Sequence, residues 1–432
     1  MIEIKELEMQ ECCVVLVGVN LGIPEEEFEH SLKELKSLAG ACGKKTVGIV
    51  TQNMESPNQA TFVGSGKVSE IKELVGFEGA QEVIFDDALS PSQMRNLGNL
   101  IGVPVLDRTN LILDIFAMRA QTREAKIQVE TARLQYMLPR LVGLREQLGR
   151  QGGASGSMSN KGAGETKLEL DRRKIEHRIS ELREELQVIA SGRDTMRKKR
   201  ENSFLPLVAL VGYTNAGKST IMNHLLERYG TRKEKTVLEK DMLFATLETT
   251  VRSLEFSDHR NFLLSDTVGF IHKLPHGLVK AFQSTLDEVR YADLLVQVVD
   301  FSDPNHMQHM EVTKNTLMEI GAAGIPQVLV YNKADLAGNY EPEELPKIQG
   351  NRIIMAASLE VGLEELTEMI RDRVYASVRE CVFFFPYDKG GEASWILEHG
   401  EVLETDYRQE GAWIRIRCSD KVRNKMRAFL QA

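Results

Sequence analysis

Apolar and polar positions along the first 107 residues follow two regular periods in turn. Short apolar runs, typical of buried strands, occupy residues 12–19, 46–52, 82–85 and 103–106. Amphipathic stretches between them predict helices at residues 25–38, 67–75 and 90–101, the last with Ser90 as N-cap before Pro91. Strand–helix alternation favours a parallel sheet with right-handed crossovers. We therefore expect residues 1–112 to form a small α/β domain.

The apolar pattern changes at Ile115, where small and apolar residues recur at alternating spacings of three and four. This coiled-coil period runs over residues 115–138 and returns over residues 168–189. We expect one long helix from Ile115 to Leu138 and a second helix folded back on it, so that residues 113–201 form an antiparallel hairpin. Between the helices, residues 143–164 contain seven glycines. They predict a Gly-rich loop at the tip.

A phosphate-binding motif follows an apolar strand at residues 205–211 and precedes a helix at residues 221–229. It fits G-x-x-x-x-G-K-[ST] at every position: Gly212, Tyr213, Thr214, Asn215, Ala216, Gly217, Lys218 and Ser219, with Thr220 next. Backbone amides of such a loop surround phosphate oxygens, and the helix N-terminus adds a favourable dipole. We expect Lys218 to span the β- and γ-phosphates and the Ser219 hydroxyl to bind Mg²⁺.

Two further motifs favour guanine nucleotides, GTP and GDP. A D-x-x-G sequence follows the next apolar strand and consists of Asp266, Thr267, Val268 and Gly269. Asp266 is expected to hold Mg²⁺ through water, and the Gly269 amide to face the γ-phosphate. An N-K-x-D sequence consists of Asn332, Lys333, Ala334 and Asp335. The Asp335 carboxylate can accept two hydrogen bonds from guanine, whereas adenine would leave it desolvated and unpaired.

The remaining GTPase elements are less regular in sequence. The expected switch segment comprises Phe244, Ala245, Thr246, Leu247 and Glu248. Thr246 is the expected Mg²⁺ ligand and γ-phosphate sensor, with Thr250 as the alternative. A backbone loop under the guanine is expected at Ala356, Ala357 and Ser358. The predicted catalytic residues are Lys218, Thr246, Gly269 and Asn215. Residues 202–378 are thus expected to form a P-loop GTPase domain, and residues 379–432 a small C-terminal α/β domain.

Composition adds a localised charge asymmetry. The 432-residue chain carries a net charge of −9, but residues 119–200 hold 19 Lys and Arg against 11 Asp and Glu. A basic hairpin on an acidic body favours one localised polyanion contact over diffuse nucleic-acid binding, although a solvated helix face has the same composition. Five cysteines without a C-x-x-C pair indicate free thiols. No apolar run is long enough to cross a bilayer and no signal peptide is evident, so we expect a cytoplasmic monomer and leave peripheral membrane association open.

The chain resembles the HflX family, a translation-factor class of GTPases. The resemblance rests on residues 212–220, 244–248, 266–270 and Gly162 to Arg173 (GAGETKLELDRR). It implies binding to the large ribosomal subunit and splitting or rescue of stalled ribosomes, with the hairpin tip against ribosomal RNA near the peptidyl-transferase centre. Asn215 resembles the asparagine that helps hold K⁺ in cation-dependent GTPases. Phe270 stands where Ras-like proteins carry a water-orienting glutamine, so slow hydrolysis until a partner completes the site is expected.

Three other interpretations remain open from the sequence. The chain could assist RNA modification, although the extra ligand sites or reactive cysteine motif typical of such GTPases are missing. It could instead be a nucleotide-switched regulator of a membrane protease or another protein. The N-terminal domain could also bind its own nucleotide, such as ATP, at residues 64–67, where a plain turn before a helix is the simpler explanation.

Overall fold

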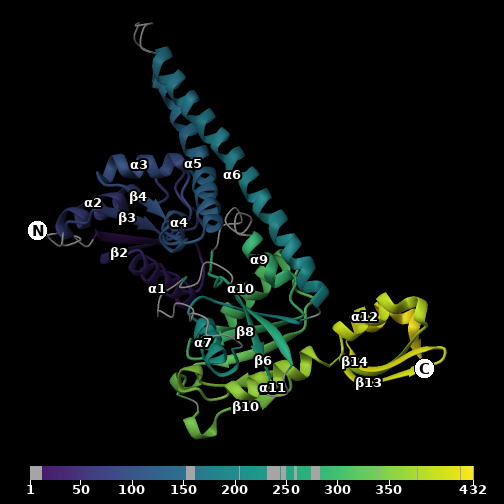
Figure 1. The fold of residues 1–432 in the computed structure, drawn as a ribbon. Helices are drawn as coiled ribbons and strands as arrows, with labels where there is room; N and C mark the ends of the chain where they lie inside the picture. The colour runs from purple at the N-terminus through teal and green to yellow at the C-terminus, as the bar shows by residue number, and fades with distance from the viewer. Residues whose placement is uncertain are drawn as a thin grey trace, which may run out of the picture.

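The chain folds into the predicted α/β architecture, with four parts that follow one another along the sequence (Figure 1). The computed structural model describes residues 12–151, 161–203, 205–230, 244, 250–256, 260–273, 283–338, 340–376, 378–418 and 420–431. Among these residues, none of the helices combines the length and the apolar character that a bilayer crossing demands.

The N-terminal domain is a parallel four-stranded sheet between two layers of helices. Its strands, in the order β2-β1-β3-β4, are β1 (Cys12–Asn20), β2 (Lys44–Asn53), β3 (Glu82–Phe85) and β4 (Val105–Asp107). Its helices are α1 (Glu25–Ala41), α2 (Ser65–Glu78), α3 (Pro91–Ile101) and α4 (Arg108–Arg119). Val14 and Leu16 face α1 and α4, whereas Val15 and Val17 face α2 and α3. Burial on both faces explains why β1 is a continuous apolar run.

Local capping sets where two of these helices begin. The predicted N-cap Ser90 accepts a hydrogen bond from the Gln93 amide, and the Gln93 side chain accepts one from the Ser90 amide. Asp107 and Asn110 form a second capping box that starts α4 seven residues before Ile115. The single helix expected from Ile115 to Leu138 is therefore wrong.

The break lies between α4 and α5 (Arg123–Gln151). Ala120 adopts an extended conformation, and the Thr122 hydroxyl accepts a hydrogen bond from the Ala125 amide at 3.2 Å, so that Thr122 caps a new helix. The three-and-four spacing persists across the break because both helices bury apolar side chains. Periodicity alone does not reveal such a kink.

Helices α5 and α6 (Lys161–Ser203) form the antiparallel hairpin, which extends past the N-terminal domain (Figure 1). Ion pairs join Arg178 to Glu130 and Arg123 to Glu185, so the residue numbers rise on one helix as they fall on the other. Both helices continue into residues 143–164, which makes the connection shorter than expected. Strong helix formers between the isolated glycines account for the extra turns. Residues 152–160 lie outside the described residues.

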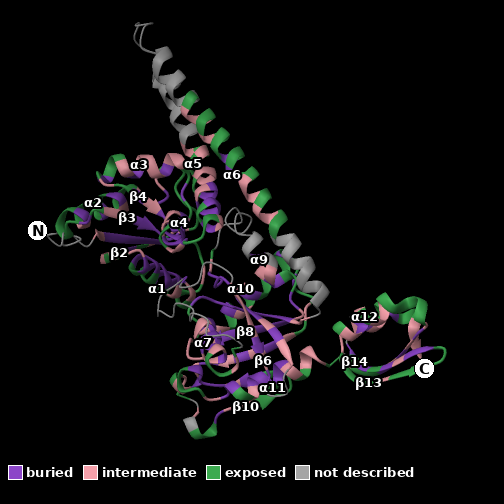
Figure 2. Cartoon of the chain, in the orientation of Figure 1, coloured by how far each residue is buried: buried purple, intermediate pink, exposed green. Residues whose placement is uncertain are grey.

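The third part has a seven-stranded sheet in the order β10-β11-β9-β8-β5-β7-β6. Its strands are β5 (Leu207–Gly212), β6 (Thr250–Glu255), β7 (Asn261–Asp266), β8 (Leu294–Asp300), β9 (Gln327–Asn332), β10 (Lys347–Gln349) and β11 (Arg352–Ile354). Its helices are α7 (Lys218–Tyr229), α9 (Gln283–Arg290), α10 (His306–Glu319) and α11 (Leu363–Val374). Apart from the antiparallel pairs β6–β7 and β10–β11, neighbouring strands are parallel. The central strands are buried between α7 and α11 on one face and α9 and α10 on the other (Figure 2).

The C-terminal part is a small antiparallel sheet with its own core. Its elements are β12 (Arg379–Phe385), α12 (Gly390–Glu398), β13 (Glu401–Arg408), β14 (Gly411–Cys418), α13 (Asp420–Lys425) and β15 (Leu430–Gln431). Phe383, Phe385 and Ile414 are buried in this core. Phe383 and Phe385 therefore pack inside the domain rather than form an exposed surface.

The N-terminal and third parts share a polar network centred on Arg108. The buried guanidinium pairs with Glu34 and, at 2.6 Å, with Asp86. From the other side, the Tyr213 hydroxyl donates to Glu34, and the Lys273 ammonium lies 2.7 Å from the Asp86 carboxylate. A buried charge is tolerated when opposite charges pair with it in this way. The network therefore fixes one domain against the other.

Replacing Lys273 tests this contact through its pH dependence. Burial raises the pKa of Asp86, but the charges of Arg108 and Lys273 outweigh burial and hold that pKa below its usual value. A carboxylate with a lowered pKa contributes stability above its unfolded pKa, and this contribution is lost as the pH falls through its folded pKa. We expect Lys273→Met to lower the free energy of unfolding by about 1–2 kcal/mol at neutral pH.

Urea denaturation at neutral pH and well below about pH 3.9, the unfolded pKa of an aspartate, should show the gap between wild type and Lys273→Met narrowing as the Asp86 carboxylate becomes protonated. Lys72→Met, at an exposed position of α2, is the matched control and should change little at either pH. A gap of equal size at both pH values would contradict the assignment.

Candidate nucleotide-binding site

The phosphate-binding motif lies between β5 and α7, as predicted. Gly212 adopts φ +144°, and a Cβ there would lie 2.2 Å from the Val298 carbonyl oxygen. Gly217 adopts φ +95°, and its Cβ would lie 2.2 Å from the Asn332 side-chain nitrogen. Only glycine fits both the backbone angles and the close approach. The loop therefore curls tightly above the sheet, in the geometry that turns backbone amides toward an anion.

Lys218 is buried at the base of this loop. Its ammonium donates to the backbone oxygens of Gly212 and Tyr213, at 3.0 and 2.7 Å. Burial lowers its pKa to about 8, while the nearby Asp266 carboxylate acts in the opposite direction. An adjacent phosphate would favour the charged form. The side chain thus sits where a bound polyphosphate restores its full charge.

The first two motifs meet directly. The Ser219 hydroxyl donates a hydrogen bond to the Asp266 carboxylate at 3.0 Å. Two oxygen atoms of the kind that ligate metal ions thus lie side by side next to the loop. The Thr267 hydroxyl bonds the Leu210 carbonyl oxygen at 2.6 Å and so anchors the second motif to β5. A Cβ on Gly269 would lie 2.7 Å from Thr214. Glycine therefore lets the two loops approach.

Asn332 ties the third motif to the phosphate loop. Its amide donates to the Ala216 carbonyl oxygen and its oxygen accepts from the Ala357 amide, both at 2.9 Å. One buried side chain thus holds the phosphate loop and the expected guanine loop at Ala356, Ala357 and Ser358 in register; Ser358 itself is exposed.

Asp335 carries a buried carboxylate oxygen that is able to accept a hydrogen bond from a guanine N–H group. Its Oδ1 is buried and has no hydrogen-bond partner among the described residues. A buried acceptor without a donor costs free energy, so a ligand with N–H groups would relieve it. Lys333 of the same motif pairs instead with Asp300, at 2.7 Å.

Of the expected switch segment, the structure describes only Phe244. Phe244 is buried and packs edge to face on Phe116 of α4, with ring centroids 4.8 Å apart. It thus belongs to a hydrophobic core that joins the N-terminal domain to Tyr213 of the phosphate loop. Ala245, Thr246, Leu247 and Glu248 lie outside the described residues. The alternative, Thr250, begins β6 with a buried hydroxyl.

Phe270 is buried against the face of the sheet that carries α9 and α10, with 2% of its surface exposed. Its backbone pairs with Gly212 and Thr214 of the phosphate loop. The Phe270 side chain therefore packs in the core of this domain.

Three features of the site were not evident from the sequence. The interdomain hydrogen bond of Tyr213, the bridging role of Asn332 and the Asp300 partner of Lys333 all join segments far apart in the chain. The G-x-x-x-x-G-K-[ST] pattern leaves the Tyr213 position unspecified, so no local signal marks it.

The order of strand, phosphate loop and helix, with the D-x-x-G and N-K-x-D loops at the same edge of the sheet, defines a P-loop GTPase domain. Three family models cover consecutive stretches: "GTP-binding GTPase N-terminal" at residues 29–117, "GTP-binding GTPase Middle Region" at 119–200 and "50S ribosome-binding GTPase" at 207–333.

Curated relatives extend over nearly the whole chain. The GTPase HflX of Caldanaerobacter subterraneus subsp. tengcongensis is 41% identical over 426 residues, which is 99% of this chain and 95% of the relative. That of Alkalihalophilus pseudofirmus is 47% identical over 333 residues, 77% of this chain and 76% of the relative. A crystal structure of a GTP-binding protein from Sulfolobus solfataricus with GDP aligns with 84% of this chain and 99% of its own, at 24% identity and a TM-score of 0.43.

The chain belongs to the HflX family of GTPases. It is accordingly an enzyme that binds GTP and hydrolyses it to GDP and phosphate. The family resemblance, the fold class and the enzyme class predicted from the sequence are confirmed.

Asn332→Ala tests the bridge between the loops. The substitution removes two buried hydrogen bonds, and we expect the free energy of unfolding to fall by about 2–4 kcal/mol with a parallel loss of GDP affinity. Thermal unfolding and fluorescent-GDP titration measure the two effects. Asn351→Ala, at an exposed asparagine, is the control. Wild-type stability in Asn332→Ala would show that the bridge is dispensable.

Proposed function

We propose that this GTPase acts on the large ribosomal subunit in the cytoplasm and splits or rescues stalled ribosomes. The observation that carries the proposal is the basic hairpin α5–α6, which joins directly to the GTPase domain. Its segment, residues 119–200, has an excess of eight positive charges on a chain of net charge −9. Such a charge pattern favours a localised contact with a phosphate backbone. The family model named "50S ribosome-binding GTPase" supports the same partner.

We assign GTP to the loop at residues 212–219, with its guanine at Asp335. The Ser219 hydroxyl and the Asp266 carboxylate offer the oxygen donors that Mg²⁺ prefers, so these residues fit the ion, Ser219 directly and Asp266 through water, and Thr246 is proposed as a further ligand. Bound with GTP, Mg²⁺ supplies positive charge to the phosphate oxygens. Lys218 adds a second positive charge, and the Gly269 amide faces the γ-phosphate.

Hydrolysis is proposed to be slow in the isolated protein. Phe270 is buried in the core, so the position after Gly269 provides no polar side chain to orient the attacking water. A partner that supplies such a group would accelerate the reaction by stabilising the transition state.

The packing of Phe244 on Phe116 suggests how nucleotide state reaches the hairpin. Phe244 is the first residue of the proposed switch segment, and Phe116 lies in α4, whose end leads into α5. A switch segment that rearranges with the γ-phosphate would change this contact at the root of the hairpin. The hairpin tip would then engage RNA in one nucleotide state and release it in the other.

Ribosome co-sedimentation tests the proposed partner. With a non-hydrolysable GTP analogue we expect the full-length protein to pellet with large subunits, and Arg145→Glu with Arg150→Glu near the tip to abolish pelleting because each reversal replaces attraction to phosphate with repulsion. Both changes leave the nucleotide site intact.

The matched control reverses two exposed lysines of the N-terminal domain, Lys36→Glu and Lys72→Glu, and should pellet normally. Equal pelleting of both double variants would contradict the hairpin contact. No pelleting of the wild type would leave the GTPase activity in place and favour RNA modification or regulation of a protein partner.

Asn215 generates a separate prediction about cations. It lies exposed in the phosphate loop in a left-handed conformation, φ 61°, and we propose that it helps hold K⁺ beside the β- and γ-phosphates. GTP hydrolysis should be faster in potassium chloride than in sodium chloride of equal ionic strength. Asn215→Ala should remove the difference. Equal wild-type rates in both salts would refute the assignment.

A further inference from the structure

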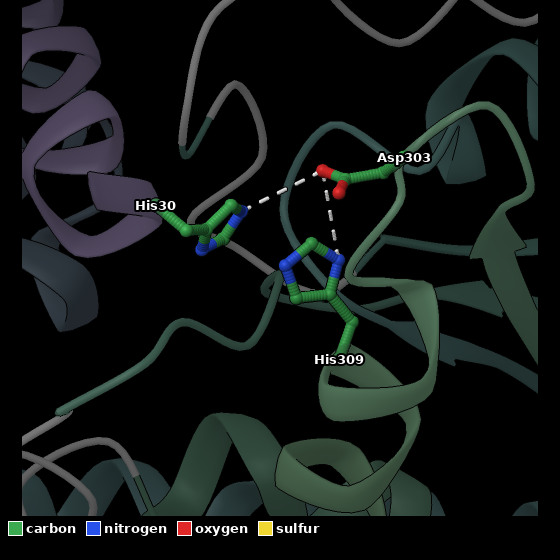
Figure 3. Close-up of side chains that lie close together, drawn as sticks. All are labelled: His30, Asp303 and His309. Atoms are coloured by element: carbon green, nitrogen blue, oxygen red, sulfur yellow. Dashed lines mark ion pairs between the residues drawn. The ribbon is translucent and has the colours of Figure 1, made fainter. Parts of the chain in front are cut away.

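Two histidines and an aspartate from different domains converge at the interface beside the phosphate loop (Figure 3). His30 lies on α1 of the N-terminal domain, Asp303 follows β8, and His309 lies on α10. His30 Nε2 is 3.7 Å from Asp303 Oδ2, and His309 Nδ1 is 4.0 Å from the same oxygen. One atom from each residue lies within 4.8 Å of the others.

The surroundings hold these side chains in place. The Asn305 amide donates to Asp303 Oδ1 at 2.8 Å, which leaves Oδ2 directed at the histidines. The His309 ring stacks on Tyr213, with centroids 3.8 Å apart and planes 9° from parallel. Tyr213 is in turn bonded to Glu34. The cluster is therefore built on fixed elements rather than on free surface side chains.

His309 carries an unsatisfied nitrogen. The residue is 7% exposed, and its Nε2 is buried without a hydrogen-bond partner among the described residues. This nitrogen lies on the side of the ring that faces His30 (Figure 3). The nitrogen of His309 placed beside Asp303 is the other one, Nδ1, 4.0 Å from Oδ2, and an imidazole ligates a metal ion through one ring nitrogen.

We propose that His30, Asp303 and His309 bind a divalent transition-metal ion, zinc in the first place, which clamps the N-terminal domain to the GTPase domain. Two imidazoles and one carboxylate form a ligand set that zinc accepts, with a fourth position left for water. The partial exposure of His30 and Asp303, with 20% and 28% of their side chains accessible, leaves room for that water and a route of entry.

The spacing suits this ion after small movements. Ligand atoms about 2.1 Å from a tetrahedral zinc lie about 3.4 Å from one another. The two histidine–aspartate separations exceed this by less than an ångström. Mg²⁺ prefers oxygen ligands, whereas this cluster offers two imidazole nitrogens and one carboxylate. The site is therefore chemically distinct from the proposed Mg²⁺ position at Ser219.

The clamp would connect the domain interface to the nucleotide. His309 stacks on Tyr213, which belongs to the phosphate loop, and His30 belongs to the N-terminal domain. Metal binding should thus restrict how far the two domains can separate around the loop. This consequence is independent of any ribosomal partner.

Isothermal titration calorimetry of metal-free full-length protein, saturated with GDP and Mg²⁺, tests the site with zinc chloride as the probe. We expect one equivalent of zinc to bind, and His30→Ala and Asp303→Asn each to weaken that binding by about tenfold or more. His177→Ala removes an exposed hairpin histidine and should bind as the wild type does. Unchanged GDP affinity and circular dichroism in the two ligand variants establish that they are folded.

Cobalt substitution identifies the ligands independently. The visible absorption of bound Co²⁺ should indicate nitrogen and oxygen ligands, without the charge-transfer bands that the free thiols would add. Absence of saturable zinc binding, wild-type affinity in both His30→Ala and Asp303→Asn, or a thiolate spectrum would each overturn the proposal. The first result would leave His30 and Asp303 as a simple ion pair.

Discussion

The nucleotide site depends on one tight loop, residues 212–219, which is held from both sides while its backbone amides remain available to bind phosphate oxygens. Asn332 ties the loop to the guanine end of the site, and Lys218 bonds its two first carbonyl oxygens. Tyr213 reaches out of the loop to Glu34, which is itself paired with the buried Arg108. The glycines of the loop lie so close to neighbouring atoms that no larger side chain would fit. Small displacements of either domain would therefore change the conformation of the loop. The N-terminal domain is therefore part of the frame of the nucleotide site, not a separate appendage.

The same interface links nucleotide chemistry to the hairpin. Tyr213, Phe244 and Ile271 belong to a hydrophobic cluster that continues through Phe116 into the N-terminal core. Well-packed clusters of this kind tend to switch between discrete arrangements rather than deform gradually. A rearrangement on one side of the cluster would therefore be transmitted to the root of α5. This continuity gives a physical route from the nucleotide site to the hairpin, and the proposed RNA contact would depend on it.

Local chemistry made much of the fold predictable. The N-cap at Ser90, the buried strands and the three nucleotide motifs all depend on residues close in sequence, and the structure places them as expected. The kink at Ala120 was missed because a helix period continues across a break when both segments bury the same face. The interdomain partners were missed for a different reason. Glu34 and Tyr213 are 179 positions apart, and their pairing follows from how two domains dock, which no local pattern encodes.

The central claim is that guanosine triphosphate occupies residues 212–219 and that Asp335 distinguishes it from adenosine triphosphate. Calorimetric titration of the wild type with GTP, inosine triphosphate and ATP tests this most directly. GTP should bind at least about a hundredfold more tightly than ATP, with inosine triphosphate between them because it lacks the exocyclic amine. Asp335→Ala should remove most of the difference. Equal affinities of the wild type for GTP and ATP, or undiminished discrimination by Asp335→Ala, would contradict it.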